Sequence, residues 1–248
     1  IIEESQYKPK PLVEIGGIPI ILHIMSIFSY YGVNNFYILV GHKSLEIKKY
    51  FLNDLYGNSH LFLDYQTKSI KFKDTIKKKW KVNIIETGEN TQTGGRLLKA
   101  KSFLKDDPFF LTYGDCLSDI NLFDLYKSHV KNKKIATVTG IQQKNRFGSL
   151  DVNKSGIVKS FSEKPLLNNA LISGGFFIFN KEIFKYLKGP STVLEKDPLS
   201  FIAHKKQLNC FFHNKFWHPM DNLREKKHLE QLWQNGKAPW KKFTKKLI

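Results

Sequence analysis

Cysteine, arginine and long apolar runs are scarce in this sequence, and each scarcity excludes a class of protein. The two cysteines, Cys116 and Cys210, lie far apart in the chain, which excludes a disulfide framework and Cys/His metal spacing and suits a reducing cytoplasm. No apolar run reaches the ~18–20 residues that span a bilayer, so we expect no membrane contact. We also expect no signal peptide.

Only three of the 40 basic residues are arginine, although the formal net charge is +18. Proteins that recognise nucleic acids rely on the bidentate fork of arginine, which lysine lacks. The lysine excess is more typical of codon bias in an AT-rich genome. We therefore expect no nucleic-acid partner, and a positive field that attracts anionic substrates into a cleft.

Strand and helix patterns alternate along the 248 residues. Apolar periodicity and turn residues predict strands at 36–40, 82–86, 109–115, 134–141, 171–180 and 208–213, and helices at 18–31, 45–55, 97–104, 122–130, 182–187, 198–206 and 222–233. This alternation predicts an α/β fold with a mostly parallel, Rossmann-like sheet flanked by helices. Exposed excursions at 65–81 and 147–165 add antiparallel hairpins. We expect one domain over 1–248, ending in a helix and tail at 217–248.

Two lysines near the start of the chain each precede a proline, in the stretch YKPKPLVEIGG. Pro9 and Pro11 fix φ and disfavour the α region for Lys8 and Lys10. The segment is predicted to be an extended, semi-rigid spacer that aims its ammonium groups. A solvated basic loop is the alternative.

Two aspartates stand where apolar segments end. Asp115 follows the apolar run 109–113 and Gly114, and Asp221 stands in FWHPMDN. In open parallel sheets ligands bind beyond the carboxyl ends of the strands. Two carboxylates from separate segments suit Mg²⁺, which takes one or two protein oxygens plus waters and phosphates. The alternatives are a turn or cap residue for Asp115 and a helix N-cap for Asp221.

Three glycine- or lysine-bearing fragments complete the set of candidates. TQTGGRLL pairs glycines with a helix start, where a base or phosphate can approach the backbone. FSEKP places Glu163 and Lys164 at a strand end, and SGGFF allows another close approach. Each fragment alone is more typical of ordinary structure than of a site.

Taken in order, six fragments resemble a known family: KPKPLVEIGGIPIILHI, TGENTQTGGRLLKA, LTYGDCLSDINL, SFSEKP, ISGGFFIFN and FWHPMDNLREKKHLEQLWQNGKAPW. Together they are similar to the glucose-1-phosphate cytidylyltransferases, a branch of the sugar nucleotidyltransferases. The resemblance covers essentially the whole chain and is weakest over 52–79. It implies transfer of CMP from CTP to glucose 1-phosphate, with release of pyrophosphate and with Mg²⁺.

The resemblance also implies roles for individual residues. It assigns catalysis to Lys10, Lys164 and Arg96; nucleotide binding to Lys10, Thr93, Gly94, Gly95, Arg96, Gly114 and Asp115; sugar-phosphate binding to Glu163, Lys164, Ser173 and Gly174; and the metal to Asp115 and Asp221. It further implies a homo-oligomer, for which the aromatic segment Trp217 to Trp240 is either an interface or plain core.

The sequence departs from the family pattern at three points. Members open with a strand and a G-G-x-G-T-R loop that wraps the triphosphate, whereas this sequence begins where that loop ends. We expect that the sequence omits this segment, a truly truncated protein being the alternative. Cys116 stands where glycine is usual, and Ser173 where asparagine is usual.

Two other readings remain open. A cytidylyltransferase could take another sugar or polyol phosphate, because the sequence does not fix the acceptor. A non-catalytic protein that binds nucleotides or nucleic acid would account for the +18 charge.

Overall fold

Strands and helices alternate through the chain, which confirms the α/β class. The computed structural model describes residues 8–57, 59–73, 79–144, 149–152, 157–162 and 166–244. The elements are η1 (Lys10–Leu12), β1 (Glu14–Ile15), β2 (Ile18–Pro19), α2 (Ile20–Tyr30), β3 (Asn35–Val40), α3 (Ser44–Tyr56), β4 (His60–Asp64), β5 (Ser69–Lys73), β6 (Lys81–Glu86), α4 (Thr93–Ala100), β7 (Phe109–Thr112), β8 (Cys116–Ser118), α5 (Leu122–Asn132), β9 (Ala136–Lys144), β10 (Ser149–Val152), β11 (Val158–Ser162), β12 (Leu166–Phe179), η2 (Lys181–Tyr186), α6 (Asp197–His204), β13 (Leu208–His213), β14 (Trp217–Pro219), α7 (Leu223–Gln234) and α8 (Lys241–Thr244).

The largest sheet has the strand order β13-β9-β12-β7. β13 runs parallel to β9, and β3 runs parallel to β6, so the expected parallel elements are present. β12 runs antiparallel to both β9 and β7. It returns from β9 through the β10–β11 excursion rather than through a crossover helix, and such a connection reverses the strand direction.

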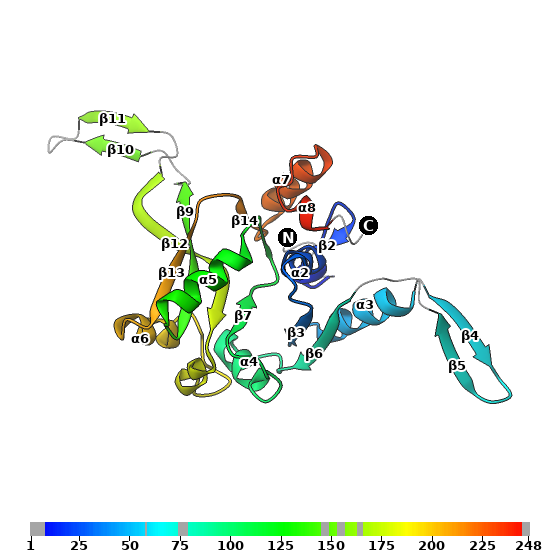
Figure 1. Ribbon diagram of the computed structural model, residues 1–248. Coiled ribbons are helices and arrows are strands. Elements are labelled where there is room, and N and C mark those ends of the chain that lie inside the picture. The colour runs from blue at the N-terminus through cyan, green and yellow to red at the C-terminus, as the bar shows by residue number, and fades with distance from the viewer. Residues whose placement is uncertain are drawn as a thin grey trace.

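Two hairpins project from opposite ends of the body (Figure 1). β4 pairs with β5 in the register His60↔Lys73, and β10 pairs with β11 in the register Ser149↔Ser162. Both predicted excursions are therefore confirmed, and the first begins at residue 60 rather than 65. The predicted site residues Glu163 and Lys164 lie outside the described residues.

Helix α2 lies at the centre of the core. Its residues 20–28 are all buried, as expected for a helix that is apolar on every side. It packs with β8, α7 and α8 in one cluster and with β3 and α3 in another. The predicted helix 18–31 is thus confirmed, except that Ile18 and Pro19 form β2 and Tyr31 caps the end.

Two local predictions near the candidate residues are wrong in detail. Lys10 does not lie in an extended spacer, because Lys10–Leu12 forms a 3₁₀ turn in which the Leu12 amide donates to the Pro9 carbonyl at 2.8 Å. Helix α4 begins at Thr93 rather than 97, and so includes the glycine pair.

The aromatic C-terminal segment packs inside the molecule. Trp240 is fully buried, Trp233 nearly so, and both belong to the α2 core cluster. Of the two possibilities for this segment, interface or core, these two tryptophans are therefore core residues. Among the described residues, no helix combines the length and apolarity needed to cross a bilayer.

Candidate active site

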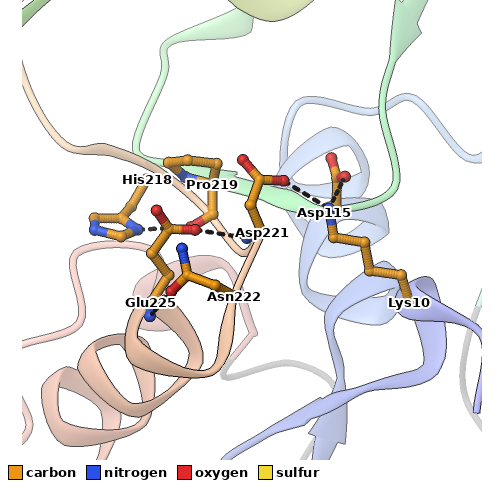
Figure 2. A network of polar contacts seen from close by, with 7 residues as sticks. All are labelled: Lys10, Asp115, His218, Pro219, Asp221, Asn222 and Glu225. Atoms are coloured by element: carbon orange, nitrogen blue, oxygen red, sulfur yellow. Dashed lines mark hydrogen bonds and ion pairs between the residues drawn. The ribbon is translucent and has the colours of Figure 1, made fainter. Parts of the chain in front are cut away.

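Lys10, Asp115 and Asp221 converge on one point from three separate segments. The Lys10 ammonium donates to Asp115 Oδ2 at 2.7 Å and to Asp221 Oδ1 at 2.6 Å. Figure 2 shows both carboxylates directed at the same Nζ atom. Three residues that the sequence analysis selected separately therefore meet at one point.

Pairing between β8 and β14 brings the two aspartates together. In this antiparallel pair Pro219 lies opposite Cys116, and the Met220 amide donates to the Asp115 carbonyl at 2.8 Å. The residue just before β8 therefore lies beside the residues just after β14. A local backbone pairing thus bridges a large sequence separation.

Asp221 is not the helix cap that the sequence left open. The N-cap of α7 is Asn222, whose side chain accepts from the Glu225 amide at 3.0 Å, and Glu225 Oε2 accepts from the Asp221 amide at 2.6 Å (Figure 2). This arrangement is close to a capping box, displaced by one residue. The Asp221 carboxylate faces Lys10 instead.

Gly114 allows η1 to approach the end of β7. A Cβ built on Gly114 would lie 3.1 Å from Pro11 Cγ, a contact tighter than ordinary packing. Pro11 directly follows Lys10, so this close approach helps to place Lys10 beside Asp115. Proline rigidity and the missing side chain of glycine thus act together.

The electrostatics of the cluster favour a charged lysine. Partial burial lowers the pKa of Lys10, but its hydrogen bonds to Asp115 and Asp221 more than offset burial, and its pKa is raised overall. The ammonium is therefore fully protonated at neutral pH. It is 29% exposed, so a ligand can reach it.

Cys116, beside Asp115, is an inert core thiol. Burial raises its pKa well above the usual value, and the neighbouring Asp115 charge adds to the rise. Its side chain is 4% exposed and belongs to the α2 core cluster. A neutral thiol is a poor nucleophile. The cluster therefore offers a cation and carboxylates rather than a covalent catalyst.

The glycine pair at the start of α4 packs against the chain itself. A Cβ on Gly95 would lie 2.3 Å from the Pro190 carbonyl oxygen, and one on Gly94 would lie 2.9 Å from Thr192 Cγ2. The Gly95 amide donates to the Thr192 carbonyl at 3.1 Å. What approaches these glycines in the structure is the turn 189–194. Their role toward a nucleotide stays a prediction.

Arg96 lies against the ends of β3 and β6. Its Nη1 donates to Thr87 Oγ1 at 2.5 Å and its Nη2 to the Glu89 carbonyl at 3.2 Å. A Cβ on Gly41 would lie 2.3 Å from Nη1, so the guanidinium occupies that glycine's side-chain space. Its predicted nucleotide and catalytic roles are not tested by these contacts.

The SGG segment of β12 is tied to β14. The Trp217 indole donates to the Gly174 carbonyl at 2.7 Å, and Ser173 Oγ accepts from the Gly175 amide at 3.4 Å. A Cβ on Gly174 would lie 2.7 Å from Ile141 Cγ1. These contacts link the predicted sugar-phosphate segment to the strand that leads to Asp221.

The structure adds two residues that the sequence did not single out, Tyr113 and Glu195. Thr93 Oγ1 donates to Glu195 Oε2 at 2.5 Å, and the Tyr113 hydroxyl donates to Glu195 Oε1. Glu195 lies more than 80 positions from both partners, so no local pattern in the sequence marks it.

The donor set of the cluster fits a small, hard cation. Asp115 and Asp221 already hold one cation, the Lys10 ammonium, between two carboxylate oxygens. Within the described part of the chain, no group of three or more His, Cys, Asp or Glu residues could hold a metal ion. Any metal here would therefore rely on ligand and water oxygens for the rest of its shell, as Mg²⁺ characteristically does.

Comparison with known proteins identifies the family. The nucleotidyl transferase family model matches residues 5–220. The chain is 41% identical over 243 residues to glucose-1-phosphate cytidylyltransferase of Salmonella typhimurium, covering 96% of this chain and 93% of that protein. It is 41% identical over 234 residues to a probable glucose-1-phosphate cytidylyltransferase of Bacillus subtilis, covering 94% and 91%.

Solved structures agree on the fold. HddC from Yersinia pseudotuberculosis superposes with a TM-score of 0.65 at 19% identity, covering 91% of this chain and 90% of that one. Apo UDP-glucose pyrophosphorylase gives 0.66 at 15% identity, covering 95% and 94%. At such identities the likeness supports the architecture alone. The family match and the 41% identity decide the assignment: the chain belongs to the nucleotidyl transferase family, among relatives of the glucose-1-phosphate cytidylyltransferase type.

Proposed function

We propose that this chain transfers CMP from CTP to glucose 1-phosphate, giving CDP-glucose and pyrophosphate. One observation carries the proposal: a lysine and two aspartates from three segments meet at one point, in a chain 41% identical to glucose-1-phosphate cytidylyltransferases. A cation held between carboxylates at a sheet end suits a triphosphate and its counter-ion.

The proposed step is an in-line displacement at the α-phosphorus of CTP. A phosphate oxygen of glucose 1-phosphate forms the new O–P bond, while the bond from the α-phosphorus to the bridging oxygen breaks and its electron pair leaves with pyrophosphate. No protein nucleophile is required, in keeping with the raised pKa of Cys116. The chain contributes positioning and charge neutralisation, which dominate phosphoryl-transfer catalysis.

Lys10 has the central part in this proposal. Its ammonium stays charged at neutral pH and is partly exposed, so it can move from the aspartates onto phosphate oxygens. Asp115 and Asp221 would hold a Mg²⁺ ion. Bound there, such an ion supplies positive charge to the phosphate oxygens. The two aspartates keep Lys10 in place when substrates are absent.

The remaining roles follow the family resemblance. We assign nucleotide binding to the segments that carry Thr93, Gly94, Gly95, Arg96 and Gly114, and sugar-phosphate binding to Ser173 and Gly174 together with Glu163 and Lys164. Support comes from the connections among these segments: Gly114 contacts Pro11, and Gly174 is hydrogen-bonded to Trp217 of β14. Arg96 and Lys164 are proposed as further catalytic cations.

Pyrophosphate release tests the proposal. Purified protein with Mg²⁺, CTP and glucose 1-phosphate should release pyrophosphate, and the Asp115→Asn variant should be at least a hundredfold slower. Turnover only with another sugar or polyol phosphate would refute the glucose assignment. Absence of turnover with every sugar phosphate would refute the enzyme. Binding of DNA or RNA that CTP does not displace would favour the nucleic-acid reading instead.

We also propose that the protein is a cytoplasmic homo-oligomer. Its two thiols are free, which suits a reducing compartment. Apolar side chains project into solvent from α3 (Leu45, Leu52 and Leu55) and from the β4–β5 hairpin (Leu61, Leu63 and Ile70), each about half exposed or more. Exposed apolar patches of several hundred Å² mark interaction sites, and a second copy is the partner always present.

Light scattering after gel filtration measures the oligomeric state of the protein. The wild type should elute as an oligomer, and the double variant Leu52→Glu/Leu61→Glu should be monomeric. Phe103→Glu, a matched change at a residue 50% exposed after α4, should leave the oligomer intact. A monomeric wild type would refute the oligomer.

A further inference from the structure

Glu195 bridges two segments that meet at the proposed active site. Its carboxylate accepts a hydrogen bond at each oxygen, from the Tyr113 hydroxyl and from Thr93 Oγ1. Tyr113 belongs to the segment between β7 and β8 and precedes Asp115 by two residues; Thr93 is the first residue of α4. One side chain therefore connects the Asp115 turn with the TGGR helix start.

The Tyr113 ring extends this bridge to a third segment. Gly175 has φ of +73°, and a Cβ there would lie 2.7 Å from Tyr113 Cδ2. The ring also meets Phe177 edge-on, with centroids 6.0 Å apart. Gly175 directly follows the predicted sugar-phosphate residues Ser173 and Gly174. The position of Tyr113 thus depends on β12 through its ring and on Glu195 through its hydroxyl.

The Tyr113 hydroxyl is a dependable donor. Burial raises its pKa, and the hydrogen bond to the Glu195 carboxylate raises it further. The phenol therefore keeps its proton at neutral pH. A hydrogen bond from a neutral hydroxyl to a carboxylate is charge-assisted and stronger than one between neutral groups.

The backbone that carries Glu195 is itself fixed to α4. In the turn before it, Thr192 Oγ1 accepts from the amides of Lys188 and Gly189 at 3.2 and 3.1 Å. The Leu194 amide donates to Thr93 Oγ1 at 2.9 Å. The carboxylate is thus presented from an ordered turn and needs little rearrangement to hold both hydroxyls.

We propose that Glu195 is a positioning residue, whose two hydrogen bonds hold the TGGR helix start in register with the Asp115 turn so that one nucleotide can contact both. It acts through Thr93 and Tyr113 and not by touching substrate. This role rests on the proposed nucleotide site, whereas the bridge itself is a property of the folded chain.

Two substitutions of Glu195 distinguish a positioning role from a catalytic one. Glu195→Ala removes both acceptors. Glu195→Gln keeps one acceptor for the Tyr113 hydroxyl and offers its amide to Thr93 Oγ1, so it keeps the bridge but loses the charge. Glu182→Ala is the control, since Glu182 is an exposed carboxylate on η2 paired with Lys185.

Two readouts are needed, hydrogen exchange of the amides at 92–96 and the dissociation constant for CTP with Mg²⁺. In Glu195→Ala we expect the amides to exchange about tenfold faster and CTP to bind about tenfold more weakly, the equivalent of one net hydrogen bond. Glu195→Gln should stay within about twofold of the wild type in both readouts. The Glu182→Ala control should match the wild type.

Every other result overturns the proposal in a recognisable way. Faster exchange without weaker CTP binding would mean that the bridge only stabilises the fold. Equal weakening in the Gln and Ala variants would mean that the Glu195 charge acts on the substrate directly. Unchanged amide exchange and unchanged CTP binding in Glu195→Ala would mean that Glu195 has no role in nucleotide binding. A wild type that binds no nucleoside triphosphate would refute the proposed function as well.

Discussion

Replacing Lys10 with methionine should separate its catalytic role from its structural one. Its ammonium lies 2.7 and 2.6 Å from the two carboxylates, so those oxygens are at most about 5 Å apart. Without the ammonium, two unit charges at that distance repel by about 3 kcal/mol at an effective dielectric constant of ~20. Because Asp221 is 57% exposed, solvent screening reduces this to about 1 kcal/mol.

Lys10→Met should therefore unfold about 1 kcal/mol more easily in urea without metal. Added Mg²⁺ should restore this loss, because the ion replaces the missing charge between the carboxylates. Activity should respond differently: kcat/KM should fall a hundred- to a thousandfold even with saturating Mg²⁺, since a cation that stabilises transition-state charge is worth that much.

Lys8→Met is the matched control. Lys8 also precedes a proline, but it pairs with Glu14, and both side chains are nearly half exposed. This variant should keep wild-type stability and pyrophosphate release. An unchanged kcat/KM in Lys10→Met, or equal losses in the two variants, would refute the reasoning.

Three further outcomes follow from single contacts. Burial lowers the pKa of His23 to about 4. The free energy of unfolding, measured in urea, should therefore be highest above pH 6.5 and fall by about 2 kcal/mol between pH 7 and pH 5. His23→Gln should remove this pH dependence. Gly95→Ala drives a methyl into the Pro190 carbonyl and should lower Tm by several degrees in calorimetry, whereas Gly189→Ala, in open space, should not. Removing divalent ions with EDTA should abolish pyrophosphate release, and added Mg²⁺ should restore it.

Strong local periodicity made most of the fold predictable. The apolar run around Ile24 predicted α2 to within two residues at each end, and the strand expected at 208–213 coincides with β13. The start of α4 was not predictable, since two glycines disfavour a helix and their close packing against 190–194 is visible only in the structure. The 3₁₀ turn at Lys10 likewise buries Leu12 against residues of α2, β3 and α3, a packing contact that the local sequence does not show.

The central cluster of the site could be predicted because strand ends mark it. Asp115 follows an apolar run, and Asp221 precedes a helix, so both positions are visible in the sequence. The choice between Asp221 and Asn222 as cap needed coordinates, since either residue type caps a helix. Glu195 could not be found, because its contacts depend on how distant segments pack.

A structure of the chain with CTP and Mg²⁺ tests the central claim most directly. We expect the triphosphate within hydrogen-bonding distance of the Lys10 ammonium, with the ion between it and the carboxylates of Asp115 and Asp221. A nucleotide bound elsewhere, with the Lys10 ion pairs unbroken, would contradict the account.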